Sequence, residues 1–257
     1  MGWTGRPWVR RALGTGEAID MKWWMIITVE NSALWPREET TVDFMGNELI
    51  LRPPTDKNAA DVRMHYEHPE NRLDAFETIL RFLSALSWSK RCPARTRLRI
   101  ECTAPMRGGK GINSPILCQG FAPSSLKTPD DPKARLATAI YREAKSVHNT
   151  LYEFLSYFKI INIIYHNGPL QKKWINNTIS HLSDKKALAR IDQLRSLELK
   201  SDIGAYLYES GRCAVAHAGV DPVVDPDNPN DFLRLSADMP VAEALAEYLM
   251  VNELGLS

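Results

Sequence analysis

The most constraining feature of this sequence is a long run of apolar residues at helical spacing in its second half. Asp131-Pro132 is a helix start signal, and Asn167-Gly168-Pro169 ends the run. Between them the apolar residues recur mostly every three or four positions: Leu136, Ile140, Val147, Leu151, Phe154, Phe158, Ile161 and Tyr165. This period lines one face of an α-helix. The range predicts either one helix about 50 Å long or two helices that meet near residues 146–149.

The rest of the second half also predicts helices joined by polar connections. We expect these helices at about 184–198, at about 202–218 and from residue 238 onward. Lys172 and Lys173 fall in what reads as a short connection, and residues 221–231 form an acidic, proline-rich loop. Ser201 is expected to cap the helix at 202–218, and Gly219 to follow its end.

The first half alternates between strand-like and helical patterns. Apolar residues at helical spacing predict one helix at 74–90. Prolines, serines and aspartates gather at residues 122–132 and indicate a linker. Runs rich in β-branched and aromatic residues predict strands at 23–29, 40–44, 48–52 and 95–103.

Together these patterns predict an α+β fold in two parts. A small mixed α/β region covers residues 21–122, a linker covers 123–130, and an all-helical part covers 131–257. Residues 1–20 precede a second methionine, and we interpret them as a flexible extension or an upstream start.

Composition and charge exclude several classes of protein. With 44% hydrophobic and 25% charged residues, the chain has the composition of a globular protein rather than a disordered one. Its formal net charge is +1, so a nucleic-acid-binding face would have to be local. The four cysteines form no C-x-x-C pair, which argues against a zinc ribbon or a dense disulfide framework. No apolar run approaches the roughly 20 residues that span a membrane. We therefore expect a cytoplasmic protein without a membrane partner.

Arg212 and His217 are the residues best suited to chemistry. Arginine is a permanent, bidentate partner for phosphate, and histidine exchanges protons near neutral pH. On a straight α-helix, five residues separate the two side chains by about 140° and about 7.5 Å, so they would not share a face. Two copies of the chain about a two-fold axis would instead bring each arginine to the other copy's histidine. The small residues Ala214, Ala216 and Ala218 would permit that close approach.

The same residues have other interpretations. Arg212 and His217 would also suit a helix-end cap and a core histidine. Cys213 and His217 have the i, i+4 spacing of metal ligands, but no second pair of ligands is evident, so no metal is expected. A nucleophilic Cys-His dyad would have no visible orienting partner.

Basic residues gather on the strand predicted at 95–103. Arg95, Arg97 and Arg99 alternate with other residues, and period two would place all three guanidinium groups on one face. Such a face would contact phosphates, or it would be a solvated outer face of the sheet. Lys172 and Lys173 are a second candidate contact for nucleic acid.

An Arg-x4-His motif near the end of a penultimate helix resembles the HEPN superfamily (higher eukaryotes and prokaryotes nucleotide-binding). The wider context, over about residues 131–257, is similar to methylamine-utilisation MauJ-type proteins. The residues that carry this second likeness are Tyr141-Arg142-Glu143-Ala144, the stretch 154–159, Arg212 with Ala216-His217-Ala218, and Asp221-Pro222 with Asp225-Pro226-Asp227.

The HEPN resemblance implies a ribonuclease that uses no metal or other cofactor and that forms a composite site in a homodimer. Arg212 and His217 would be the catalytic pair, with RNA as the substrate, a toxin or defence effector as the cellular role, and a regulatory protein as a further partner. Glu209, three residues before Arg212, would orient the guanidinium or would form a simple surface ion pair. Active members commonly carry a polar residue after the arginine, where this chain has Cys213. The alternative is a non-catalytic protein that binds nucleic acid or acts in assembly, as a MauJ-like accessory protein.

Overall fold

The computed structural model describes residues 22–30, 35–104, 126–196, 202–217, 219 and 222–257. The N-terminal extension expected at 1–20, the start of the expected linker, and Ser201 lie outside these residues.

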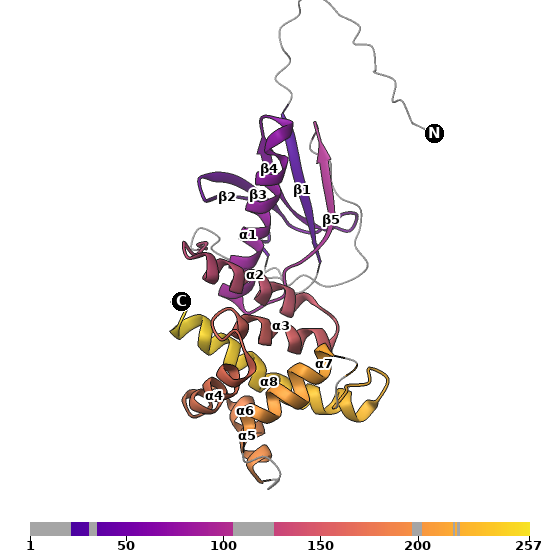
Figure 1. The fold of residues 1–257 in the computed structure, drawn as a ribbon. Coiled ribbons are helices and arrows are strands. Elements are labelled where there is room, and N and C mark those ends of the chain that lie inside the picture. Colours follow the sequence, from indigo (N-terminus) through magenta and orange to yellow (C-terminus); the bar gives the residue numbers. More distant parts are fainter. Residues whose placement is uncertain (1–21, 31–34, 105–125, 197–201, 218, 220–221) are drawn as a thin grey trace, which may run out of the picture.

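The first half of the chain forms an antiparallel five-stranded sheet (Figure 1). The strands are β1 (Trp23–Glu30), β2 (Thr40–Phe44), β3 (Asn47–Arg52), β4 (Ala60–Tyr66) and β5 (Arg95–Cys102), in the spatial order β2-β3-β4-β1-β5. The four strands expected from the sequence are confirmed. Met45 and Gly46 join β2 to β3 with φ values of 56° and 73°, as in a two-residue hairpin turn.

Strand β4 was not predicted, because charged residues interrupt its apolar pattern. Asp61 and Arg63 lie in the centre of the sheet, where both side chains are fully buried. They neutralise each other in an ion pair with Nε–Oδ1 and Nη2–Oδ2 distances of 2.6 and 3.0 Å. Because the two charged residues pair with each other, they can lie in an interior strand, but they give its sequence the pattern of a polar segment.

Helix α1 (Arg72–Lys90) covers one face of the sheet and links the two halves of the molecule. Its apolar face packs with strand residues into one core cluster, which includes Ile79, Phe82 and Leu83. Near its end, Trp88 belongs instead to the core of the helical half. The short 3₁₀-helix η1 (Pro69–Asn71) precedes α1. Arg91 ends α1 in the left-handed conformation, with φ of 49°.

The second half is helical and begins with two helices in place of one. α2 (Pro132–Ser146) and α3 (Thr150–Asn162) meet at the break that was one of the two alternatives. Asp131 and Asn149 cap them, because each side chain accepts a hydrogen bond from the first turn. The sheet followed by helices confirms the α+β class.

The remaining helices correct two expectations. Lys172 and Lys173 lie in a helix, α4 (Gly168–Thr178), rather than in a connection, because Asn167-Gly168-Pro169 is also a start signal, with Asn167 as its cap. The last helix, α8 (Pro229–Asn252), begins well before Asp238, since Asn228 and Pro229 start it. The other elements are η3 (Ile179–His181), α5 (Lys185–Ser196), α6 (Ile203–Tyr206), the π-helix η4 (Leu207–Cys213) and α7 (Ala214–Ala216).

Pro240 lies inside α8, where it has no N–H to donate to the carbonyl of Ser236. Helix α8 nonetheless continues through it and packs against α3 and α5. Figure 1 shows the sheet and α1 at one end of the molecule and the helices from α3 to α8 at the other. Within the described ranges, no helix is long and apolar enough to cross a membrane.

Candidate functional site

Arg212 and His217 contact each other within a single chain. Nη1 of Arg212 lies 3.3 Å from Nε2 of His217. The expectation that one chain separates these side chains is therefore wrong, because the segment is not a straight α-helix. After one turn of α6 the chain enters the π-helix η4, and His217 follows α7 with extended backbone angles of φ −130° and ψ 113°. Of residues 212–217, only Arg212 and Cys213 lie in η4, and the backbone N–H of His217 donates to the oxygen of Cys213 at 3.0 Å. The change to extended backbone at His217 then brings its side chain to Arg212.

Two glycines allow this segment to lie close to its neighbours. A Cβ added at Gly211 would lie 2.8 Å from the ring of Phe154 on α3. A Cβ added at Gly204 would lie 2.3 Å from the backbone oxygen of Lys172 on α4. Ala214, which was expected to face a second copy, is instead buried in the core of its own chain. Gly204, Gly211 and Ala214 thus serve packing within the chain, whereas Ala216 is exposed.

The Arg212–His217 contact has a defined direction. Arginine has no hydrogen-bond acceptor, so its N–H donates and Nε2 of His217 accepts. Both side chains are accessible, since Arg212 is partly exposed and His217 is exposed.

Tyr208 lies between Arg212 and a second cation. Its ring centre is 5.6 Å from Cζ of Arg212 and 6.0 Å from Nζ of Lys172 on α4. Burial, and then a hydrogen bond with the thiol of Cys213, raise the pKa of Tyr208. Gly168 at the start of α4 leaves room for the ring, because a Cβ there would lie 2.8 Å from it. The result is a patch of two cations, an aromatic ring, a thiol and an imidazole. We call it the Arg212 cluster, and it consists of Lys172, Tyr208, Arg212, Cys213 and His217.

Glu209 does not hold Arg212. Its carboxylate accepts from Nζ of Lys172 at 2.8 Å, and this hydrogen bond raises the pKa of Lys172. The expected orienting role is therefore wrong, because in the π-helix Glu209 is directed toward α4. Lys172 belongs to the Arg212 cluster, whereas Lys173 is exposed on α4. The thiol of Cys213 is free and lies 3.8 Å from Nη1 of Arg212.

A buried polar network anchors the segment that leads into η4. Asp238 on α8 is 1% exposed and accepts from the hydroxyl of Tyr206 at 2.8 Å and from Nε of Arg190 at 2.9 Å. Burial raises the pKa of Asp238, against the opposing effect of these donors and of Arg234. The network ties α6 to α5 and α8. Sequence reasoning missed it, although Asp238 shares the helical face of Leu235 and Leu245 and so was placed to be buried.

The basic strand does not present one arginine face. The register between β1 and β5 shifts between Ile27 and Val29, so an extra residue in β5 reverses the alternation of side chains. Arg95 and Arg97 both contact Glu30, at 4.0 and 3.1 Å. Arg99 lies on the other side, over the ring of Phe76 of α1 and 3.0 Å from Glu101. The shared face expected from period two is therefore wrong.

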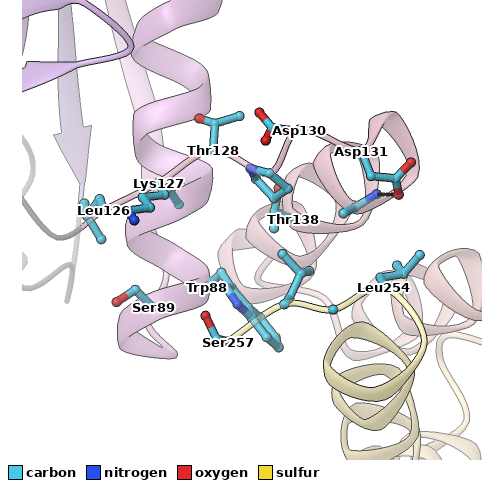
Figure 2. A pocket seen from close by; sticks show the side chains of 15 residues that line it. Trp88, Ser89, Leu126, Lys127, Thr128, Asp130, Asp131, Thr138, Leu254 and Ser257 are labelled. Carbon is cyan, nitrogen blue, oxygen red and sulfur yellow. Dashed lines mark hydrogen bonds between the residues drawn. The ribbon is translucent and has the colours of Figure 1, made fainter.

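The cavity of about 350 Å³ shown in Figure 2 lies away from the Arg212 cluster. Trp88 and Ser89 at the end of α1, Thr138 of α2 and the C-terminal residues line it. None of the candidate site residues contributes to its wall. The described ranges also contain no group of three or more His, Cys, Asp or Glu side chains placed to hold a metal ion.

The helical half matches a known family. The family model described as Methylamine utilization protein MauJ matches residues 137–251. The match runs from within α2 to near the end of α8, so it includes the Arg212 cluster and the Asp238 network but not the sheet. No curated protein and no solved structure matches the chain. The resemblance to MauJ-type proteins is confirmed, and the chain is similar to that family over its helical half.

Proposed function

We propose that this protein is an endoribonuclease whose helical part, residues 131–257, is an HEPN-like domain with Arg212 and His217 as the catalytic pair. The observation that carries the proposal is the 3.3 Å contact between Nη1 of Arg212 and Nε2 of His217 on an accessible surface. The pair combines a phosphate ligand with a proton acceptor, two of the groups that RNA cleavage through the 2′-hydroxyl requires.

The reaction begins when the substrate phosphate competes with His217 for Arg212. The guanidinium turns to two phosphoryl oxygens, and this releases the lone pair on Nε2. Nε2 then takes the proton of the ribose 2′-hydroxyl as O2′ attacks phosphorus. The P–O5′ bond breaks, and the products are a 2′,3′-cyclic phosphate and a 5′-hydroxyl end that takes up a proton. Arg212 stabilises the charge that develops on the phosphoryl oxygens, and RNA is selected over DNA because DNA has no 2′-hydroxyl.

Lys172 and Tyr208 extend the phosphate-binding surface. The ion pair of Lys172 with Glu209 lies at the surface, where Glu209 is 55% exposed, and such pairs contribute little to stability. A backbone phosphate can therefore replace Glu209 as the partner of Lys172. Lys173, on the same helix, and the arginines Arg95, Arg97 and Arg99 on β5 are proposed as further contacts to RNA.

We also propose a homodimer through the helical part. In-line displacement places the base and the acid on opposite sides of phosphorus, so one imidazole does not serve both roles at once. A second copy would supply a second histidine as the acid. A dimer is therefore proposed because the reaction needs two proton-transfer groups. It is not needed to bring Arg212 to His217, since that contact already exists in one chain. The α/β region at 21–122, joined by a linker at 123–130, would bind RNA or a regulatory protein in a toxin or defence effector.

The test is cleavage of end-labelled RNA by the purified full chain in the presence of EDTA. We expect products with 2′,3′-cyclic phosphate ends, and no cleavage when the target nucleotide is 2′-deoxy. Arg212→Ala and His217→Ala should each remove cleavage. Arg195→Ala and His148→Ala, which change exposed residues of the same types on other segments, should leave it intact.

The alternative is a non-catalytic protein that binds nucleic acid or assembles with a partner, as an accessory protein similar to the MauJ family. The match to that family, whose description concerns methylamine utilization, is the observation that favours it. RNA binding that depends on Arg212 without any cleavage would support this alternative. Cleavage that persists in both Arg212→Ala and His217→Ala would show that the Arg212 cluster is not the active site.

A further inference from the structure

A second candidate site lies where the sheet meets the helical half. A cavity of about 220 Å³ opens between β5 and the last turn of α2. Arg95 and Thr96 line it from β5, and Arg142, Glu143 and Ser146 line it from α2. None of these residues belongs to the Arg212 cluster.

Two buried donors at this cavity have no partner among the described residues. Nη1 of Arg142 and Oγ of Ser146 are buried and make no hydrogen bond to the part of the chain that the structure describes. The side chain of Arg142 is only 10% exposed, and its Nη2 lies 3.2 Å from the carboxylate of Glu143. Burial lowers the pKa of Arg142, and Glu143 offsets this effect only in part. Buried polar groups are nearly always hydrogen-bonded, so two unpartnered donors at one cavity require an explanation.

The charges around the cavity favour an anion. Arg95 and Arg142 are cationic; Arg95 lies 4.0 Å from Glu30, and Arg142 contacts Glu143, the one acidic residue of the lining, which is 71% exposed. The C-terminal end of α2 has the opposite effect, because a helix end of this kind carries partial negative charge. A charge-assisted hydrogen bond from the buried guanidinium attracts an anion more strongly than the partial charge at the end of α2 repels it. In addition, β5 is an edge strand, so part of its backbone is unpaired by the sheet.

We propose that this cavity binds a phosphate group, either free or as a phosphate monoester, through the guanidinium of Arg142 and the hydroxyl of Ser146. Both residues line the cavity, but these two atoms are buried, so binding includes a rotation of the two side chains toward the ligand. A bound phosphate would bridge β5 to α2 and so connect the sheet to the helical half. The site is separate from the proposed RNA-cleaving pair, and its test does not depend on whether that pair cleaves RNA.

The test is isothermal titration of the full chain with sodium phosphate and, separately, with adenosine 5′-monophosphate. Saturable binding of one equivalent is expected. Tighter binding of the nucleotide would identify a phosphate monoester as the ligand, and equal affinity would identify phosphate alone. Arg142→Gln should remove binding, and Ser146→Ala should weaken it about tenfold, as expected for one lost hydrogen bond. Lys133→Gln makes the same charge change at an exposed position of α2 and should bind like the wild type.

Three results would overturn the proposal: no saturable binding of either probe, full affinity in Arg142→Gln, or an equal loss of affinity in Lys133→Gln. Phosphate should also raise the melting temperature of the protein, and sodium chloride at matched ionic strength should not. Circular dichroism establishes that each variant is folded. If Arg142→Gln does not fold, Ser146→Ala decides the matter, and unchanged affinity in that variant refutes the site.

Discussion

Gly211→Ala is the change that most directly perturbs the placement of Arg212. The added Cβ would lie 2.8 Å from Cε1 and Cζ of Phe154, whereas ordinary contacts of this kind begin at 3.4 Å. Phe154 is fully buried and stacks on Phe158 with ring centres 5.1 Å apart, so its ring has little room to move. Either the ring or the π-helix must shift by more than half an ångström.

The magnitude follows from two opposing effects. Replacing glycine by alanine within a helix stabilises by about 1 kcal/mol. Overpacking a core costs about 1–3 kcal/mol. We therefore expect Gly211→Ala to lower the free energy of unfolding by about 1 kcal/mol, which is a decrease of about 2–4 °C in melting temperature for a chain of this size. Cleavage of RNA should fall much further, because the displaced π-helix moves Arg212 away from His217.

Urea denaturation and the RNA cleavage assay measure these two effects. Gly219→Ala is the control, since a Cβ there meets nothing within 4 Å. The double variant Gly211→Ala/Phe154→Leu should be more stable than the sum of its single changes predicts, by about 1 kcal/mol, because the smaller side chain makes room for the Cβ. A stabilised Gly211→Ala protein, or strictly additive effects, would refute the contact between η4 and α3.

Two further predictions concern the supporting structure, and a third concerns the cellular role. Tyr206→Phe leaves the buried carboxylate of Asp238 without one donor and should cost about 1–3 kcal/mol in urea denaturation, whereas Tyr152→Phe, at a 61% exposed ring, should cost nothing measurable. Burial raises the pKa of Glu153 above its ordinary value of 4.5. Protonated Glu153 therefore favours the folded state, and its contribution is present below pH 4.5 and is lost as pH rises through the folded pKa. Glu153→Gln should flatten that decline in a pH series of unfolding free energies. Expression of the wild type should arrest bacterial growth and that of His217→Ala should not; equal growth would contradict the toxin role.

Elements with strong local signals could be predicted from the sequence. The hairpin β2–β3 has alternating apolar residues around a turn at Met45 and Gly46, and α1 has an apolar stripe of period 3.6. Asp131 marks a helix start because its side chain accepts from a first-turn N–H group. These features depend on neighbours in sequence, so local reasoning reaches them.

Features that depend on distant partners could not be predicted. In β4, Asp61 and Arg63 are buried in the sheet as an ion pair, so their charges do not indicate an exposed segment. The bulge between β1 and β5 reverses the alternation of the arginines, and no residue of β5 alone signals it.

The candidate site shows the same limit. Arg212 and His217 were identified by residue type, but their contact depends on the irregular end of this segment, where η4 is followed by α7 and His217 has extended backbone. A periodicity analysis assumes the α-helical period and therefore separates the two side chains. Glu209 was assigned to Arg212 for the same reason, although Lys172 is its partner.

The central claim is that Arg212 and His217 act as a pair within one chain. Mixing Arg212→Ala protein with His217→Ala protein, under conditions in which subunits exchange, tests it most directly. If the pair lies within one chain, no chain in the mixture has both residues, and the mixture should stay as inactive as either variant alone. Recovery of a substantial part of wild-type RNA cleavage would mean that arginine and histidine come from different chains, and this would contradict the account.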